Sequence, residues 1–387
     1  MNVVSESVIH QSHNVQAHCT LDPDRKHDPH ATRFGKFLQA CIKFEASDLI
    51  VKSGQSPRVR LRGSLKALET EPVSFEEFME IAKSILTEEQ FNDLHKYGSV
   101  DFAYDYDAQN RFRINLFQSR GKISVAARLV TSKIRRFQDL YLPEVMAEIA
   151  MQPQGIVILA GVTGSGKSTT IASMLNYVNE RRACHIVTLE DPIEYIFEDK
   201  KATIHQREIG IDCLDFKTGL RALVRENPDV VLIGEMRDSE TFEAALHASE
   251  TGHLVFGTIH ASSASQTFGR IYDLFHADER EQVRKILGYQ MRAIVYQKLL
   301  PTLKPEIARI PALEILINSP SCRKYILEAR ENELIEVIKA QESQQIGMID
   351  FNGSLVKLVE SEMIHMRVAM ENTPNADELR MRLKGIG

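Results

Sequence analysis

The sequence has few cysteines and no long apolar run, and each absence limits what the protein can be. The five cysteines are scattered, with no C-x-x-C spacing, which argues against a disulfide framework or a zinc finger and for a reducing compartment. No apolar run approaches the roughly 18 residues needed to cross a bilayer. The N-terminus has neither the basic nor the apolar region of a signal peptide. We therefore expect a cytoplasmic protein that does not span the membrane.

Charge and composition exclude further classes of protein. Acidic residues outnumber basic ones by 53 to 47, for a net charge of −6, so a generally basic nucleic-acid binder is not expected. Hydrophobic residues make up 43% of the chain and charged residues 26%, which is the balance of a globular protein with a large core. At roughly 100–200 residues per domain, the length of 387 residues predicts two or three domains.

The chain divides into three parts by pattern. Residues 1–33 are polar and rich in histidine without an apolar period, and they predict a disordered tail. Residues 34–132 predict a small α+β domain, with helical spacing over 75–94 and two strands over 111–130. Residues 133–387 alternate short apolar runs with helical segments, which predicts βα units around a parallel sheet and a mostly helical part from about residue 302. The runs predicted as strands are 155–160, 186–189, 230–233 and 254–259.

A basic stretch lies at the end of the small domain. Residues 108–138 hold eight basic side chains and no acidic one. An ordinary solvated sheet face followed by a linker would explain this stretch. A surface that meets phosphate, of either a nucleotide or a nucleic acid, would explain it equally well.

Residues 161–168 fit the phosphate-loop pattern G-x-x-x-x-G-K-[ST]. Glycines let successive backbone N–H groups point at phosphate oxygens, and the helix that follows presents its positive end. Lys167 can reach the β- and γ-phosphates of ATP, and the Ser168 hydroxyl can ligate Mg²⁺. A buried strand before the loop and a helical period after it match the expected context. The predicted nucleotide-binding residues are Gly161, Thr163, Gly164, Ser165, Gly166, Lys167, Ser168 and Thr169.

Polar groups follow each of the other predicted strands, and ligands of open α/β sheets bind at the carboxyl ends of strands. Glu235 could orient or deprotonate the attacking water, and His260 could sense the γ-phosphate. Glu190 and Asp191 could hold the Mg²⁺ shell or the water, and Glu194 is a further catalytic candidate. For each acid taken alone, a helix cap or an ion pair is the alternative.

Three further catalytic candidates lie away from the strand ends. Arg221 and Arg225 are four residues apart on a predicted helix, so they would share one face and supply charge to the site or to a subunit contact. A surface ion pair, for example with Glu226, is the alternative. His253 precedes a predicted strand, and a purely structural histidine is the alternative there.

Together these segments resemble the PilT family of type IV pilus retraction ATPases, within the secretion-ATPase superfamily. The resemblance covers about residues 34–364. Beyond the phosphate loop, it rests on six segments: 46–49, 111–121, the "Asp box" at 190–194, 206–210, the Walker B segment at 234–241 and the "His box" at 251–260. This combination is far more specific than a phosphate loop alone.

The resemblance implies an α/β fold, in which a RecA-like P-loop ATPase domain follows a smaller PAS-like α+β N-terminal domain. It also implies a ring hexamer that uses ATP and Mg²⁺ near the subunit junction. An N-domain arginine from a neighbouring subunit could then approach the nucleotide, and Arg111, Arg113 and Arg128 are the candidates. The implied function is pilus retraction in twitching motility, with an inner-membrane platform protein as partner and no nucleic acid. The implied location is the cytoplasmic face of the inner membrane.

Two departures from the family pattern leave other functions open. Ile50 stands where the family has a histidine, and residues 321–328 match the C-terminal retraction motif only at Arg323, Ile326 and Glu328. An ATPase of a related conjugation or secretion system is therefore one alternative. A nucleotide-binding accessory subunit that acts with a partner motor ATPase is a second. The basic stretch at 108–138 suggests a third alternative, a nucleic-acid motor on the same core, and the overall acidic balance of the chain weighs against it.

Overall fold

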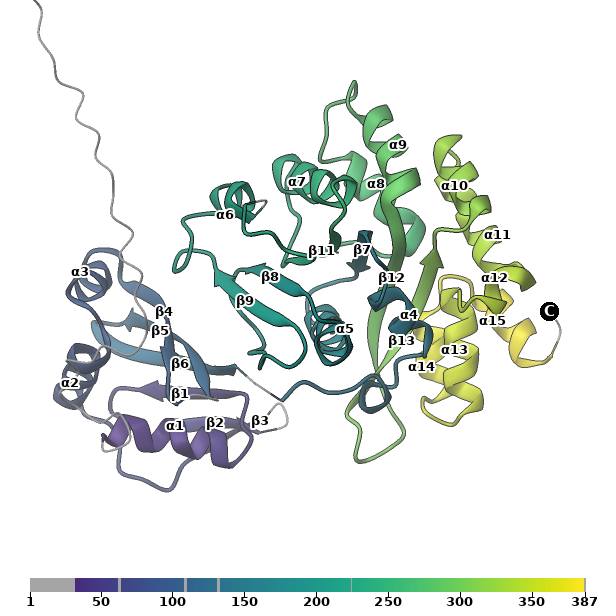
Figure 1. Cartoon of the computed structure of the whole chain (residues 1–387). Coiled ribbons are helices and arrows are strands. Elements are labelled where there is room, and N and C mark those ends of the chain that lie inside the picture. Colours follow the sequence, from purple (N-terminus) through teal and green to yellow (C-terminus); the bar gives the residue numbers. More distant parts are fainter. Residues whose placement is uncertain (1–31, 62–63, 108–109, 131–132, 224, 386–387) are drawn as a thin grey trace, which may run out of the picture. The chain divides into compact units, whose positions relative to one another are not determined.

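The computed structural model describes residues 32–61, 64–107, 110–130, 133–223 and 225–385. The chain separates into two compact units, Met1–Leu129 and Val130–Gly387, and each is described by itself below (Figure 1). Residues 1–31 of the predicted disordered tail lie outside the described residues. The first described helix, α1, begins at Arg33, within the last residues assigned to that tail.

The first unit is a six-stranded sheet with the strand order β3-β2-β1-β6-β5-β4. Its strands are β1 (Asp48–Lys52), β2 (Arg58–Leu61), β3 (Ser64–Ala67), β4 (Ser99–Asp105), β5 (Arg111–Ser119) and β6 (Lys122–Val130). Its helices are α1 (Arg33–Lys43), α2 (Phe75–Ile85) and α3 (Glu88–Tyr97). The helix predicted over 75–94 is therefore two helices, because Thr87 caps the start of α3 with a reciprocal pair of side-chain hydrogen bonds to Gln90.

Alternation along β5 explains which face of this sheet is open. Phe112 and Ile114 are fully buried and share a core with Leu38 of α1 and Phe78 of α2. The residues between them point to the opposite face, as the two-residue period of a strand requires. Arg113 on that face is exposed. The basic residues of β5 thus lie on the face that the helices leave uncovered.

The second unit is built on a seven-stranded sheet with the order β13-β12-β7-β11-β10-β8-β9. The strands are β7 (Gly155–Ala160), β8 (His185–Glu190), β9 (Thr203–Glu208), β10 (Val230–Ile233), β11 (Leu254–Ile259), β12 (Met291–Pro301) and β13 (Arg309–Ile317). All neighbours are parallel except β12 and β13. The predicted parallel sheet and its four predicted strands are confirmed. The prediction of mostly helical structure from residue 302 is wrong over β13, whose residues form an antiparallel hairpin with β12.

Helices cover both faces of this sheet (Figure 1). Along β7, Ile156 and Ile158 face a core shared with Phe242 and Phe268. Val157 faces a core shared with helices α4 (Val145–Ala150) and α5 (Lys167–Arg181). Within the described residues no helix is both long and apolar enough to cross a bilayer. The helices are α4 (Val145–Ala150), α5 (Lys167–Arg181), α6 (Phe216–Leu223), α7 (Ser239–Glu250), α8 (Ala264–Tyr272), α9 (Arg280–Gln290), α10 (Pro320–Leu327), α11 (Leu334–Lys339), α12 (Gln341–Gln345), α13 (Phe351–Glu360), α14 (Met366–Asn372) and α15 (Ala376–Leu383).

Phe256 tests the packing of the central sheet. It is fully buried in β11, between β7 and β10. Phe256→Ala should lower the free energy of unfolding of the second unit by about 3–5 kcal/mol, because it removes a large buried ring and leaves a cavity. Urea denaturation measures this, with Leu214→Ala as the control because Leu214 is 76% exposed. Equal losses in the two variants would contradict the packing described here.

Candidate functional site

The predicted phosphate loop turns sharply between the end of β7 and the start of α5. Gly161 has φ +147° and Gly166 has φ +89°, conformations that side-chain-bearing residues rarely adopt. There is also no room for a side chain. A Cβ on Gly161 would lie 2.5 Å from the Gln297 carbonyl oxygen, and one on Gly166 would lie 2.7 Å from Gln297 Nε2. Both glycines are therefore required by conformation and by space.

Lys167 lies across this loop and is 8% exposed. Its Nζ donates hydrogen bonds to the carbonyl oxygens of Gly161, at 2.7 Å, and Val162, at 3.1 Å. Burial lowers the pKa of Lys167, and the negative charges of Glu235 and Glu194 partly offset that effect. The ammonium group is thus held beside two carboxylates at the N-terminal end of α5, where phosphate oxygens could replace the two carbonyls as its partners.

Glu235 follows β10, and both of its carboxylate oxygens have partners. Arg237 donates from Nη2 to Oε2 at 2.6 Å, and His260 Nε2 lies 3.0 Å from Oε1. The hydrogen bond from Arg237 is the main cause of a lowered pKa of Glu235, and His260 and Lys167 act in the same direction. The structure therefore brings Lys167, Glu235, His260 and Glu194 together at the carboxyl ends of the strands, as the sequence predicts.

Glu190 lies at the end of β8 but points into the protein, with 8% exposure. Its Oε1 accepts hydrogen bonds from Thr188 Oγ1, at 2.7 Å, and from Gln206 Nε2, at 3.2 Å. Gln206 also donates to the Tyr195 carbonyl oxygen and accepts from the Phe197 amide. Glu190 thus helps to hold the segment that follows it. Burial raises the pKa of Glu190 to about 7.

The other acids of the Asp box are exposed and face two different cations. The negative charge of Glu194 acts to raise the pKa of Lys167, and that of Asp191 acts to raise the pKa of Arg237. Within the described ranges, no three His, Cys, Asp or Glu side chains are grouped so that they could hold a metal ion by themselves. A magnesium ion at Ser168 and Asp191 would take its remaining ligands from phosphate oxygens and water, as Mg²⁺ in nucleotide sites commonly does.

His253 is placed away from these groups. It precedes β11, and its backbone oxygen accepts a hydrogen bond from the Gly155 amide at the start of β7. His253 therefore lies at the amino ends of these strands, whereas His260 lies at their carboxyl ends. Its Nδ1 lies 2.9 Å from the Ala248 carbonyl oxygen and 3.1 Å from Thr251 Oγ1. These contacts fasten the end of α7.

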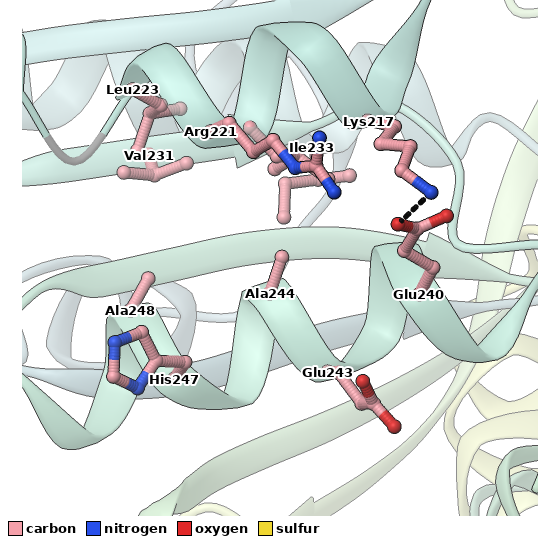
Figure 2. Close-up of a pocket in the computed structure, with 11 residues that line it drawn as sticks. Lys217, Arg221, Leu223, Val231, Ile233, Glu240, Glu243, Ala244, His247 and Ala248 are labelled. Carbon is pink, nitrogen blue, oxygen red and sulfur yellow. Dashed lines mark ion pairs between the residues drawn. The ribbon is translucent and has the colours of Figure 1, made fainter.

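Arg221 lines a separate cavity of about 330 Å³ between α6 and α7. Lys217 and Glu240, which also line it, form an ion pair (Figure 2), and their charged atoms lie 2.6 Å apart. Leu220 and Ile233 help to form its apolar floor. Arg221 therefore lies in a different pocket from the phosphate loop.

The prediction that Arg225 shares a helical face with Arg221 is wrong. Helix α6 ends at Leu223, and Asn227, with φ +53°, precedes Pro228 in the turn that follows. A proline restricts the residue before it to non-helical conformations, so the helix cannot continue. The carboxylate of Glu226, which was suggested as a partner of these arginines, pairs with Arg207.

The three N-domain arginines each have an acidic partner within their own unit. Arg128 Nε lies 2.9 Å from Asp48, Arg111 Nε lies 3.6 Å from Asp105, and Arg113 Nε lies 3.9 Å from Asp101. The side chain of Arg128 is 72% exposed and that of Arg111 only 17%. Exposed pairs are weak, so Arg128 could exchange its partner for another anion at little cost.

The segment that only partly matches the family's C-terminal motif forms helix α10, which packs on α9. Ile326 is fully buried, and Arg323 donates to the Gly288 carbonyl oxygen at 3.2 Å while its guanidinium lies 5.6 Å from the centre of the Tyr289 ring. Lys324 and Leu327, where the chain departs from the motif, are exposed. Two of the three matching residues thus attach α10 to α9.

Two residues at the site were not predicted. Arg237 holds Glu235, and its sequence signal is its position two residues after that acid. Gln297 contacts the phosphate loop from β12, 2% exposed. The available signal for Gln297 was an amide directly after the apolar residues Ile294–Tyr296 in a strand-like segment, since a buried polar residue in a strand needs a partner.

Comparison with known proteins gives consistent matches along the chain. The family model described as "Type II/IV secretion system protein" matches residues 35–376. The chain is 40% identical to Escherichia coli YggR, described as uncharacterized, over 81% of this chain and 94% of that protein. It is 36% identical to the type IV pilus retraction ATPase PilT of Pseudomonas aeruginosa, over 87% of this chain and 96% of that protein. A crystal structure of the retraction motor PilT with bound ADP matches with a TM-score of 0.83 and 38% identity, over 90% of this chain and 99% of that one.

These matches confirm the predicted fold class, a RecA-like ATPase domain that follows a smaller N-terminal domain. They also extend the similarity beyond the phosphate loop. The PilT match covers 90% of this chain, so it spans both the first unit, with its sheet, and the second unit, with its phosphate loop.

The buried carboxyl of Glu190 makes stability depend on pH. Its folded pKa of about 7 is raised from 4.5, so its contribution is present below pH 4.5 and is lost as the pH rises through 7. Glu190→Gln, which mimics the neutral acid, should therefore gain about 3 kcal/mol relative to the parent between pH 4.5 and pH 8. Urea denaturation of both proteins at several pH values measures this. The exposed Glu240→Gln is the control, and a difference between Glu190→Gln and the parent that is independent of pH would contradict the assignment.

Proposed function

The chain belongs to the type II/IV secretion system protein family, and we propose that it is a ring-forming motor that hydrolyses ATP to drive type IV pilus retraction. The observation that carries this proposal is that Lys167 and Glu235 lie near enough at the carboxyl ends of the strands for the charge of each to shift the pKa of the other. It occurs in a chain that matches a PilT structure over 90% of its length. The similarity to pilus motors over both units favours this function over a conjugation or secretion ATPase.

Nucleotide binding follows from the loop. The backbone N–H groups of residues 161–168 and the start of α5 would receive the β- and γ-phosphates. Lys167 would exchange the carbonyl oxygens of Gly161 and Val162 for phosphate oxygens. We assign Mg²⁺ to Ser168 and Asp191, where it would neutralise phosphate charge. Thr169 would lie beside the α-phosphate, next to Tyr195, whose hydroxyl is 2.7 Å from Thr169 Oγ1.

Hydrolysis needs a group that aligns a water molecule with the γ-phosphorus. The pKa of Glu235 is lowered, chiefly by its hydrogen bond from Arg237 and also by the charge of Lys167, so the carboxylate is charged. It would accept a proton from the water as the water oxygen attacks phosphorus and ADP leaves. One of its oxygens must then be released by Arg237 or His260. Because the side chain of Arg237 is 73% exposed, we assign the release to Arg237 and a γ-phosphate-sensing role to His260.

Mechanical work requires copies of the chain in a ring. We propose a homo-hexamer, in which Arg128, the most exposed of the three N-domain arginines, reaches the nucleotide of a neighbouring subunit. Turnover would alter the arrangement of the two units, and the ring would pass that motion to a pilus platform protein at the cytoplasmic face of the inner membrane.

The proposed role of Lys167 predicts a loss of nucleotide binding in its variant. Lys167→Ala should weaken MgATP affinity by about tenfold or more, because charge-assisted hydrogen bonds to phosphate are lost. Isothermal titration calorimetry measures this. Lys217→Ala is the matched control, since Lys217 is exposed and pairs with Glu240. If the two variants bind MgATP equally well, the loop is not the nucleotide site.

The proposed role of Glu235 predicts a loss of ATP hydrolysis in its variant. Glu235→Gln should still bind MgATP, but its turnover should fall by about 10²-fold or more, because an amide cannot accept the proton of the water. Phosphate release measures turnover, and Glu240→Gln is the matched acidic control. Hydrolysis at the parental rate by Glu235→Gln would refute the role assigned to this residue.

The pilus function is tested in the organism that encodes the chain. The chromosomal gene is replaced by the Glu235→Gln form, and labelled pili are followed by fluorescence microscopy. We expect extension to continue, retraction to stop and surface pili to accumulate. Retraction at the parental frequency would overturn the proposed pilus function while leaving the ATPase assignment intact.

A further inference from the structure

Gln297 is placed beside the phosphate loop by the register of the sheet. Strand β12 runs parallel to β7, with Tyr296 opposite Ala160. The next residue of β12, Gln297, therefore lies alongside Gly161, the first residue of the loop. A Cβ on Gly161 would lie only 2.5 Å from the Gln297 carbonyl oxygen. The loop and this part of β12 thus approach each other as closely as their backbones allow.

The side chain of Gln297 uses both ends of its amide on the loop and its helix. Nε2 donates to the Ser165 carbonyl oxygen at 2.7 Å, and Oε1 accepts from Thr170 Oγ1 at 2.8 Å. Gln297, Ser165 and Thr170 are each 2% exposed. Water cannot replace these bonds at such burial, so the loss of the amide would leave two buried polar groups without partners.

The bond to Ser165 fixes the direction of one peptide group in the loop. In a trans peptide the C=O and the following N–H point in opposite directions. Because Gln297 holds the Ser165 carbonyl oxygen, the Gly166 N–H must point away from Gln297. Gly166 has no side chain, and a Cβ there would meet Gln297 Nε2 at 2.7 Å. The amide therefore also explains why glycine is required at position 166.

We infer that Gln297 is a positioning residue of the nucleotide site, which holds the Ser165–Gly166 peptide in the orientation that binds phosphate. This inference rests on the proposed function of the loop. Gln297 does not itself need to touch the nucleotide. By holding the loop and the first turn of α5 to β12, it sets the direction of a backbone donor before phosphate arrives. Preorganised donors of this kind lower the cost of binding.

The test uses Gln297→Met, which keeps the length of the side chain and removes both hydrogen bonds. MgADP binding to the full chain is measured by calorimetry, and KM and kcat for MgATP are measured alongside. We expect affinity for MgADP to fall about tenfold or more, and KM for MgATP to rise by more than kcat falls. Thr170→Val should cost less, because the bond to Ser165 remains. In the Gln297→Met background, Thr170→Val should have no further effect, since its partner is already gone.

The control is Asn318→Leu, which removes two side-chain hydrogen bonds at the other end of the β12–β13 hairpin, to the carbonyl oxygens of Gly288 and Met291. This variant should lose stability and keep its affinity for MgADP. Parental affinity in Gln297→Met, or an equal loss in Asn318→Leu, would overturn the inference and leave the proposed function standing. A parent protein that does not bind MgADP would overturn both.

Discussion

The structure of the site depends on how firmly the phosphate loop is held where β7 ends. The Gly161 amide donates to the Ile259 carbonyl oxygen of β11 at 3.2 Å, and Gln297 of β12 holds the loop from the other side. The next residue after Ile259 is His260, so the bond that fixes the start of the loop also fixes the position of the histidine. Two neighbouring strands therefore place the loop, and the side chains that follow those strands are placed with it.

Burial separates the acids around this loop into different physical states. Glu235 is partly exposed and paired with Arg237 and His260, so it stays charged. Glu190 is enclosed, and its pKa rises to about 7. The charged carboxylate is the one that lies next to Lys167 and the strand ends, where a water molecule could be activated. The enclosed one holds the backbone of the segment that carries Glu194. Acids of the same chemical type thus serve different purposes because of where they are buried.

The central strands and the residues at their ends could be predicted from the sequence, because these strands are buried on both faces of the sheet. Strands β7, β10 and β11 are buried on both faces and read as continuous apolar runs, so their bounds match the prediction. Strand β9 lies at the edge and reads Thr-Ile-His-Gln-Arg-Glu, which has no such signal. Glu235 and His260 could be predicted because they are polar residues that directly follow these apolar runs. His253 became a candidate as part of the His box, although it precedes its strand and so lies at the opposite end of the sheet from His260. Arg225 was placed on the helix of Arg221 although Pro228, three residues later, is a signal for the end of that helix. The contacts of Gln297 depend on strand order, which periodicity does not reveal.

We propose that the ATPase sites of this chain are completed by neighbouring copies. The most direct measurement is MgATP hydrolysis per chain by the purified protein, followed across concentrations that span its assembly as recorded by light scattering. We expect turnover per chain to be low in the dilute protein and to rise as rings form, because the proposed role of Arg128 is to reach the nucleotide of a neighbouring subunit. A turnover per chain that stays constant across assembly, or assembled protein that hydrolyses no ATP, would contradict it.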